Sequence, residues 1–221
     1  FVVQNRGVNN PNNNFESLEH MVDALGETFL PAFDINDDFA KTPYAQYKNF
    51  FNIYATYWED APTQDEWWSF NIIKNLRDET FLPWSNDETG WATWFSITQY
   101  GGGGGAGLNR EERVGDGLLY GAEWETLLHE FGHTMPGLPD EYSASGEWSG
   151  GNCWESGNTT GNTVRDEFPW RKWIDPDTPL PTPYTGEYEN TIGAFEGALT
   201  NYFGCHRPTA KGCYMGAGGF G

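Results

Sequence analysis

The sequence predicts an α/β fold whose C-terminal half is rich in loops. Apolar residues recur at helical spacing in residues 15–33 and 121–135, and β-branched and aromatic runs occupy 49–60 and 90–100. After Cys153 the chain is rich in Gly, Pro, Asn and Trp and shows few periodic patterns. Its 221 residues can form one sizeable domain, or two lobes that share a cleft.

The first expected elements are an Asn-rich loop at 5–16 and the helix at 15–33, which Gly26 and Pro31 end. A short helix is also expected at 192–203, within the loop-rich half. The first helix carries apolar residues at helical spacing at Leu18, Met21, Val22 and Leu25.

Strands, a helix and a glycine-rich segment are expected next. Residues 49–60 are predicted to form a buried strand, 65–83 a helix and 90–100 a second strand. Residues 101–113 begin with five consecutive glycines, which form regular structure only at an entropic cost. The segment lacks the Gly-Lys-Ser/Thr ending of a phosphate loop, so we expect a flexible flap or connector.

The helix predicted at 121–135 holds two of the four histidines of the chain. At about 100° per residue, His129 and His133 lie next to each other and nearly opposite the apolar stripe of the helix. Pro136 and Gly137 are expected to end the helix just beyond them. The apolar stripe consists of Trp124, Leu127, Leu128 and Phe131.

Two imidazoles one turn apart can bind the same tetrahedral metal ion through neutral nitrogens. Glu130 lies between His129 and His133 in the sequence and points to the flank, where it can reach a metal-bound water more easily than the ion. This HExxH arrangement is typical of zinc hydrolases in which the glutamate is the general base. The alternative is a chance match on an ordinary helix, which the rarity of histidine makes uncommon.

A catalytic zinc keeps three protein ligands and one open position, so a third ligand is needed. The turn after the helix supplies Asp140 and Glu141. We choose Asp140 from its position, with Glu141 or a distant residue as the alternatives. Either acid could instead face solvent or accept a hydrogen bond from a histidine N–H.

The cysteines leave the disulfide pattern open. Cys153, Cys205 and Cys213 are three in number, so one must stay unpaired or pair outside the chain. A bond from Cys205 to Cys213 would close a short loop, whereas Cys153 bonded to either would tie distant segments. Asn158-Thr159-Thr160 is a glycosylation sequon, which has meaning only in a eukaryotic secretory pathway.

Composition excludes several kinds of partner. The chain has 32 acidic and 12 basic residues and a net charge of −20, with no cluster of Lys and Arg for a phosphate backbone. It has no run of about 18 apolar residues. We therefore expect no nucleic-acid partner, no membrane span and a monomer in a secreted or extracellular location, the periplasm and cell surface included. Because the chain starts at Phe1 without Met, we expect that a targeting sequence has been removed.

The stretch HEFGHTMPGLPDEY at 129–142 is similar to the active-site segment of the IgA-peptidase-type zinc metallopeptidases of bacteria. Three further segments are similar to that family in the same order, at 168–175, 192–208 and 213–215. The resemblance is strong from about 116 to 216 and weak before 90, where only general character matches.

The stretch also resembles the metzincin pattern, in which a glycine turn precedes the third ligand and a methionine lies in a tight turn beneath the metal. Gly137, Asp140 and Met215 occupy these positions. The chain departs from the pattern because Asp replaces the usual third histidine, and the glycine and the acid each come one residue late. The resemblance implies His129, His133 and Asp140 as metal ligands and Glu130 as the general base.

The resemblance further implies a metzincin-like zincin fold for a single catalytic domain over 1–221. A mixed twisted sheet and the active-site helix would form an N-terminal lobe at 1–137. A loop-rich C-terminal lobe at 138–221 would carry the Met-turn. The substrate cleft would run between the lobes, with the glycine run at its border.

Several other side chains have open roles. His206 could stabilise an oxyanion or contact substrate, although a structural hydrogen bond is favoured, and Glu196 could brace a histidine or the fold. His20, on the first helix, is expected to have no catalytic role. Three tyrosines are candidates for a phenol that donates to the tetrahedral intermediate, namely Tyr142, Tyr202 and Tyr214. Each of them taken alone is expected to pack in the core.

These observations predict a zinc-dependent endopeptidase that hydrolyses a protein or peptide substrate through a metal-bound water activated by Glu130. The alternative is a secreted, Trp-rich glycan- or protein-binding module with a structural zinc, whose fourth ligand would be Cys153 or His206. Calcium is a second candidate cofactor, because residues 34–38 and the Asn-rich start offer oxygen ligands, although neither matches an EF-hand loop.

Overall fold

The structure is a computed structural model whose described residues fall into two units. These units are Phe1–Met135 and Pro136–Gly221, and the lobe boundary predicted after Gly137 falls two residues later. The described residues are 2–5, 15–28, 54–57, 92–98, 104–109, 114–120, 124–142, 153–199, 203–211 and 213–216.

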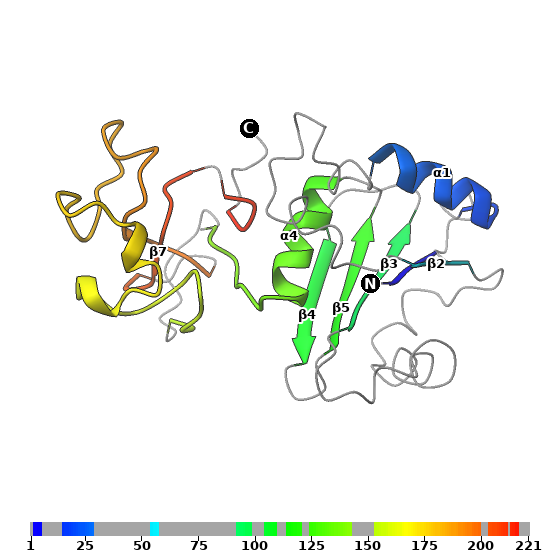
Figure 1. The fold of residues 1–221 in the computed structure, drawn as a ribbon, viewed down its shortest axis with the longest axis horizontal. Helices are drawn as coiled ribbons and strands as arrows, with labels where there is room; N and C mark the ends of the chain where they lie inside the picture. The colour runs from blue at the N-terminus through cyan, green and yellow to red at the C-terminus, as the bar shows by residue number, and fades with distance from the viewer. Residues whose placement is uncertain are drawn as a thin grey trace. The chain divides into compact units, whose positions relative to one another are not determined.

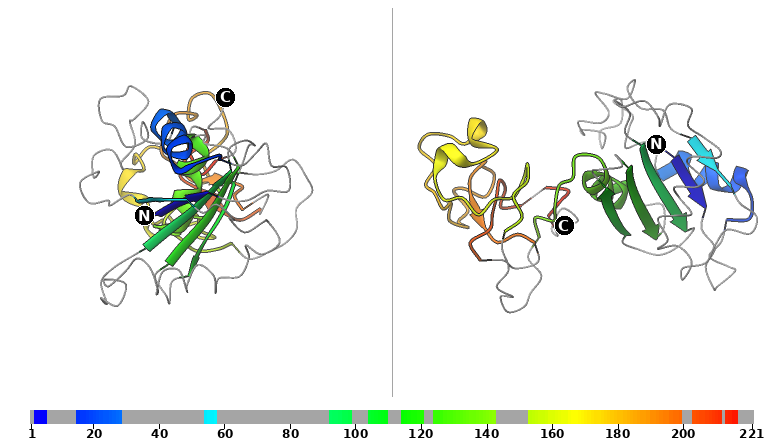
Figure 2. Two further views of the ribbon diagram at one scale, coloured as in Figure 1. Left: turned by 90° about the vertical axis from the view of Figure 1, so that its right-hand side faces the viewer. Right: turned by 90° about the horizontal axis from the view of Figure 1, so that it is seen from below.

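The first unit contains a five-stranded sheet with the order β2-β1-β3-β5-β4 (Figure 1). Strands β2, β1, β3 and β5 run parallel, and β4 runs antiparallel to β5. The strands lie side by side in a further view (Figure 2). This unit therefore mixes helix and strand around a small mixed sheet. The strand bounds are β1 Val2–Asn5, β2 Tyr54–Thr56, β3 Ala92–Thr98, β4 Gly104–Asn109 and β5 Val114–Tyr120.

The central strand β3 confirms the strand predicted at 90–100. Its alternate residues Thr93, Phe95 and Ile97 are all buried, as expected for one face of a strand packed against the core. The strand predicted at 49–60 is present as β2 at one end of the strand order, and its Ala55 is exposed. Residues 49–53 and 58–60 of the predicted range lie outside the described residues. Strands β1 and β5 were not expected from the sequence.

The prediction of a flexible flap at 101–113 is wrong for β4. Gly104 pairs with Leu119 and Asn109 pairs with Val114, so the glycines take part in a regular antiparallel ladder. The backbone hydrogen bonds to β5 offset the entropic cost of fixing glycine, because glycine keeps the same donor and acceptor as any other residue.

The first helix, α1 (Leu18–Thr28), confirms the helix predicted at 15–33, but its apolar face is narrower than expected. Met21 and Leu25 are buried, whereas Leu18 and Val22 are 45% and 46% exposed. The helix contacts the edge strand β2, which covers a limited part of its surface. The helix predicted at 65–83 lies outside the described residues.

The second helix, α4 (Trp124–Thr134), confirms the helix predicted at 121–135 and lies against β4 and β5. Leu127, Leu128 and Phe131 of the predicted stripe are buried. The amide of Met135 donates to the carbonyl of Phe131 at 3.1 Å and completes the last turn. None of the helices that the structure describes is both long enough and apolar enough to cross a membrane.

The described residues of the second unit lie mostly in loops, as predicted. The regular elements among these residues are two short 3-10 helices and a two-stranded antiparallel sheet. The helix predicted at 192–203 is wrong at its centre, because Phe195 and Glu196 form a strand and Gly197 and Leu199 have positive φ angles of 102° and 53°. The elements are η6 Arg165–Glu167, η7 Arg171–Trp173, β6 Phe195–Glu196 and β7 His206–Arg207.

A small apolar core holds the second unit together. Phe168, Trp170, Ile174 and Ala194 are buried in one cluster. The indole N–H of Trp170 donates to the carbonyl of Gly193 at 2.6 Å, so its polar atom is satisfied inside the core.

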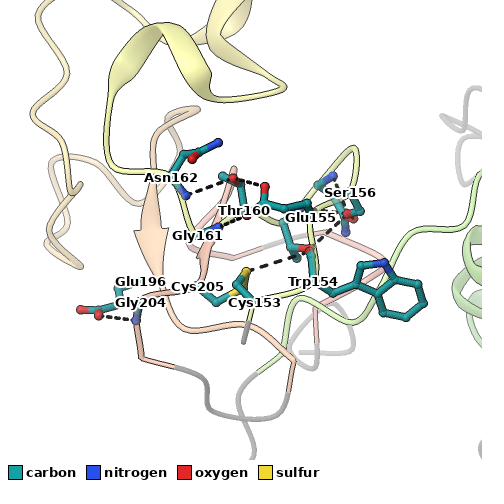
Figure 3. Close-up of a disulfide and its surroundings, with 12 residues drawn as sticks. Cys153, Trp154, Glu155, Ser156, Thr160, Gly161, Asn162, Glu196, Gly204 and Cys205 are labelled. Carbon is teal, nitrogen blue, oxygen red and sulfur yellow. Dashed lines mark hydrogen bonds between the residues drawn. A yellow bond between two sulfur atoms is a disulfide. The ribbon is translucent and has the colours of Figure 1, made fainter. Parts of the chain in front are cut away.

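A disulfide between Cys153 and Cys205 ties segments 52 residues apart and settles the pairing that the sequence left open (Figure 3). Cys213 is the free cysteine and is half-buried. Trp154, beside the disulfide, is 57% exposed.

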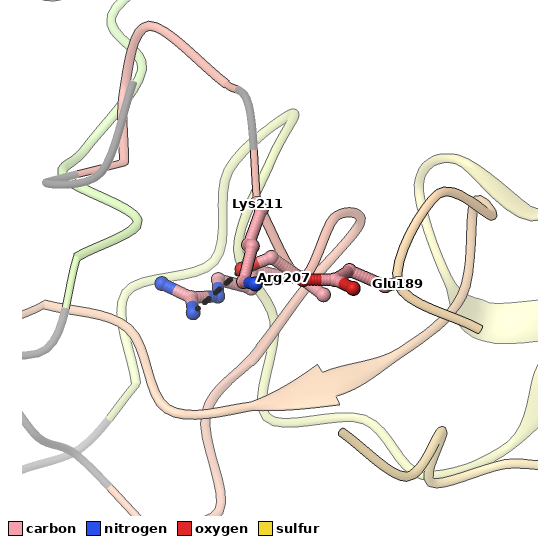
Figure 4. Close-up of polar contacts among 4 residues, drawn as sticks. Glu189, Arg207 and Lys211 are labelled. Carbon is pink, nitrogen blue, oxygen red and sulfur yellow. Dashed lines mark hydrogen bonds and ion pairs between the residues drawn. The ribbon is translucent and has the colours of Figure 1, made fainter. Parts of the chain in front are cut away.

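An exposed ion pair lies at the rim of the second unit. Lys211 pairs with Glu189 near Arg207 (Figure 4). The ammonium side chain is 73% exposed, so solvent screens the pair and its contribution to stability is small. Arg207 instead donates inward, to the backbone carbonyls of Glu141 and Ala210.

Candidate metal centre

Helix α4 brings His129, Glu130 and His133 together. One ligand atom from each of these residues lies within 4.8 Å of the others. The two imidazole rings have centroids 4.8 Å apart and planes at 88°, and their Nε2 atoms are 3.3 Å apart. The spacing of one helical turn therefore converges two nitrogen atoms on a single point.

The separation of the two Nε2 atoms fits a shared metal ion. Two nitrogens bound at about 2.05 Å to one tetrahedral zinc ion lie about 3.3 Å apart. His129 and His133 show this separation of 3.3 Å. The same distance also fits a hydrogen bond in which one imidazole donates to the other, so the distance alone is compatible with both a shared ion and a histidine pair.

Glu130 has a different environment from the two histidines. It is 4% exposed, whereas His129 and His133 are half-buried. The apolar side chains of Leu127 and Phe131 occupy the buried face of the same helix. A nearly buried carboxylate beside two imidazoles is a group that can accept a proton.

Close packing between α4 and β5 fixes the end of this helix. A Cβ atom on Gly115 would lie 2.3 Å from the carbonyl oxygen of Thr134, the residue after His133. A Cβ on Gly117 would meet the ring of Phe95 at the same distance. Gly115 and Gly117 thus allow Thr134 and Phe95 to approach β5 closely, which the sequence analysis did not predict. The available signal was the presence of glycine at alternate positions of a strand.

The residues proposed as third ligand belong to the second unit. Asp140 is half-buried, and its carbonyl accepts a hydrogen bond from the amide of Leu199 at 3.0 Å. Its role as a metal ligand stays a prediction. Glu141 is 2% exposed, and both of its carboxylate oxygens accept hydrogen bonds from side chains of the second unit.

Residues 213–216 form the tight turn that contains the methionine. The carbonyl of Cys213 accepts a hydrogen bond from the amide of Gly216 at 2.8 Å, and Met215 is 4% exposed. The carbonyl of Met215 accepts a hydrogen bond from the amide of Glu141 at 2.6 Å. This contact joins the turn to the segment that follows α4. The position of Met215 beneath a metal stays a prediction.

Burial changes the acid–base properties of two groups in this network. Burial raises the pKa of the Glu141 carboxyl, and hydrogen bonds, led by that from Asn158, oppose the rise. Burial and the neighbouring charge of Glu141 raise the pKa of the Cys213 thiol to about 12. Cys213 is therefore a protonated, unreactive thiol at neutral pH.

The other candidate side chains are placed as follows. His206 is 4% exposed and packs edge-to-face on Phe168, as a structural histidine does. Glu196 braces the hairpin, because its carboxylate accepts the amide of Gly204 at 2.8 Å. His20 accepts the amide of Glu16 at the start of α1. Of the candidate phenols, Tyr142 and Tyr214 are half-buried and Tyr202 lies outside the described residues.

The sequon at Asn158 is closed in the folded chain. Asn158 is 6% exposed, and its side-chain nitrogen donates to the carbonyl of Pro139 and to the carboxylate of Glu141. An amide nitrogen held in this way is inaccessible to a glycosyl group, so Asn158 is a buried structural residue.

Among the residues that the structure describes, His129, Glu130 and His133 form the group of metal-binding side chains that meets the distance criterion for one ion. Calcium has no support from this part of the chain. The acidic segment 34–38, on which that hypothesis depended, lies outside the described residues.

Residues 95–191 match the family model described as IgA Peptidase M64. The matched range contains the histidine pair, Glu130 and Asp140 and ends before Met215. A comparison with curated proteins gave no match. Residues 95–191 are thus similar to the IgA peptidase M64 family, which confirms the resemblance drawn from the motifs.

Proposed function

We propose that the chain is a zinc-dependent endopeptidase with a metzincin-like fold. The observation that carries the proposal is the 3.3 Å separation of the His129 and His133 Nε2 atoms on α4. Glu130 lies between these two residues in the sequence, and its side chain is buried. The family match supports a peptidase acting on protein substrates. The mixed sheet followed by the active helix agrees with a zincin arrangement.

His129, His133 and Asp140 are the residues that would hold the ion. Asp140 is preferred to Glu141 because both Glu141 oxygens already accept hydrogen bonds from Asn158 and Thr209. Zinc, when bound, supplies Lewis-acid activation of a water molecule and of the scissile carbonyl.

Glu130 performs the proton transfers in this proposal. Its carboxylate accepts a proton from the attacking water and passes it to the departing amine. The burial of Glu130 against the core of α4 limits its motion and keeps bulk water away. His129 and His133 are half-buried, so part of this histidine pair is exposed to solvent.

The test is Glu130→Gln, which keeps size and shape but removes the proton acceptor. We expect metal content equal to the parent and hydrolysis of a peptide library reduced by about 10²–10⁴-fold or more. His20→Ala is the matched control for loss of a histidine and should change neither, whereas His129→Ala should lose metal. Cleavage by Glu130→Gln at the parent rate would contradict the mechanism.

The alternative of a binding module rests on exposed tryptophans. Trp154 and Trp173 are 57% and 71% exposed, as a stacking platform would require, whereas Trp170 is buried in the core. A structural zinc closed by Cys153 is disfavoured because that sulfur is in the disulfide. Glycan or protein binding that persists in Glu130→Gln without any parent hydrolysis would favour the module.

We also propose a secreted or extracellular location. The Cys153–Cys205 disulfide supports it, because such bonds persist in oxidising compartments. Mass mapping of that bond in protein recovered from the native source would test the proposal. Reduced cysteines throughout would contradict it.

A further inference from the structure

Glu141 is a buried acid whose polar groups all bind other segments of the second unit. It is 2% exposed. Its Oε1 accepts hydrogen bonds from Asn158 Nδ2 at 2.9 Å and from Cys213 Sγ at 3.5 Å, and its Oε2 accepts from Thr209 Oγ1 at 3.3 Å. Three separate stretches of the chain therefore meet at one carboxylate.

The backbone of Glu141 is held as well. Its amide donates to the carbonyl of Met215 at 2.6 Å, and its carbonyl accepts from the guanidinium of Arg207. The contact with Met215 joins Glu141 to the methionine turn. The side chain attaches this residue to segments 17 to 72 positions away, and the backbone amide attaches it to Met215.

The residues on either side of Asp140 are fixed by the same network. The carbonyl of Pro139 accepts from Asn158 Nδ2 at 3.0 Å, and the carbonyl of Asp140 accepts from the amide of Leu199 at 3.0 Å. With the carbonyl of Glu141, three consecutive carbonyls are bound in a stretch that is itself neither helix nor strand. Such bonding fixes the direction in which the intervening side chain leaves the backbone.

We infer that Glu141 is a positioning residue that fixes the backbone of Asp140 and couples it to the turn at Met215. The inference rests on the proposed function for the part that concerns the metal. Loosening the backbone beside a ligand lowers metal affinity, as loss of an orienting hydrogen bond does, by about 10–100-fold.

Glu141→Ala removes all three side-chain hydrogen bonds at once. We expect the zinc dissociation constant, measured by chelator competition, to rise about 10–100-fold. In the metal-free chain, hydrogen exchange should speed up at 137–142 and 213–216 and stay unchanged at 192–196. The exchange result does not depend on a metal, so it separates failure of this inference from failure of the proposed peptidase.

The matched control is Thr182→Val in the same unit. Thr182 is 3% exposed, donates to the carbonyl of Pro179 at 2.8 Å and accepts from the amide of Ala194 at 2.8 Å, away from Asp140. We expect it to speed exchange at 192–196 and to leave the zinc dissociation constant within about twofold. An equal effect of both variants at 137–142 would show a merely structural role and overturn the inference.

Glu141→Gln should rescue the alanine variant. The amide oxygen of glutamine can still accept hydrogen bonds from Asn158 and Cys213. The NH₂ group of glutamine can donate to the hydroxyl of Thr209, which then acts as acceptor instead of donor. A loss as large as that of Glu141→Ala would overturn the hydrogen-bond explanation. Should Glu141→Ala fail to fold, Thr209→Val removes a single donor and should give a smaller change of the same pattern.

Discussion

The two units position their polar side chains in different ways. In Phe1–Met135 the histidine pair sits on α4, whose spacing and packing on β4 and β5 set the geometry. In Pro136–Gly221 a disulfide, a small apolar core and side-chain hydrogen bonds to loop carbonyls do this work. The histidine pair can be predicted from local sequence because it lies on a helix. The arrangement of the second unit cannot, because it depends on contacts between distant segments.

The largest expected effect concerns the second unit. Replacing Cys153 and Cys205 by serine removes a cross-link over 52 residues, which the chain-entropy model values at about 4 kcal/mol of unfolding free energy. Urea unfolding followed by hydrogen exchange should show the loss in 153–216 and little change in α4. An equal loss of protection in both units would mean that they do not differ in the way described.

Gly115→Ala is the corresponding change in the first unit. Its Cβ would lie 2.3 Å from the backbone carbonyl oxygen of Thr134, so α4 must shift, at a cost of about 1–3 kcal/mol. Metal affinity should fall as well, because His133 precedes Thr134. Gly105→Ala on β4 meets nothing within 4 Å and is the control, with stability and metal affinity close to the parent.

The smallest effect sharpens the contrast through Cys213. Its pKa of about 12 in the fold exceeds its ordinary value of 9.0, so folding favours the thiol form. The stability that this provides is complete below pH 9 and is lost as pH rises from 9 towards 12. Cys213→Ser should weaken that alkaline loss, and the native chain should label slowly with iodoacetamide at pH 8–9. Fast labelling in the native state would contradict the burial of this thiol.

The helices and strands that were predicted correctly are those whose apolar residues repeat with the period of the element. Helices α1 and α4 and strand β3 carry apolar repeats of the right period, and all were predicted. Half of the residues of strand β4 are glycine and it has no side-chain pattern, so only its pairing with β5 reveals it. Residues 192–203 resembled a helix because of Ala, Leu and Phe, yet Gly197 and Leu199 take positive φ angles directly after β6.

The residues of the candidate site also differ in how far they could be predicted from local sequence. His129, Glu130 and His133 were found because their relation is local to one helix. The roles of Asn158 and Glu141 were not foreseen, because a hydrogen bond between side chains 17 positions apart leaves no spacing rule in the sequence. The disulfide likewise required knowing which of three cysteines meet.

The most direct test of the metal centre is X-ray absorption at the zinc edge on the chain loaded with one equivalent of zinc. We predict two imidazole nitrogens at about 2.0–2.1 Å, oxygen neighbours for the remaining positions, and no sulfur at about 2.3 Å. His129→Ala and His133→Ala should each lose most of the zinc, and the zinc that remains should show one imidazole nitrogen fewer. A sulfur ligand, or spectra unchanged in both variants, would contradict the assignment of the metal to this histidine pair.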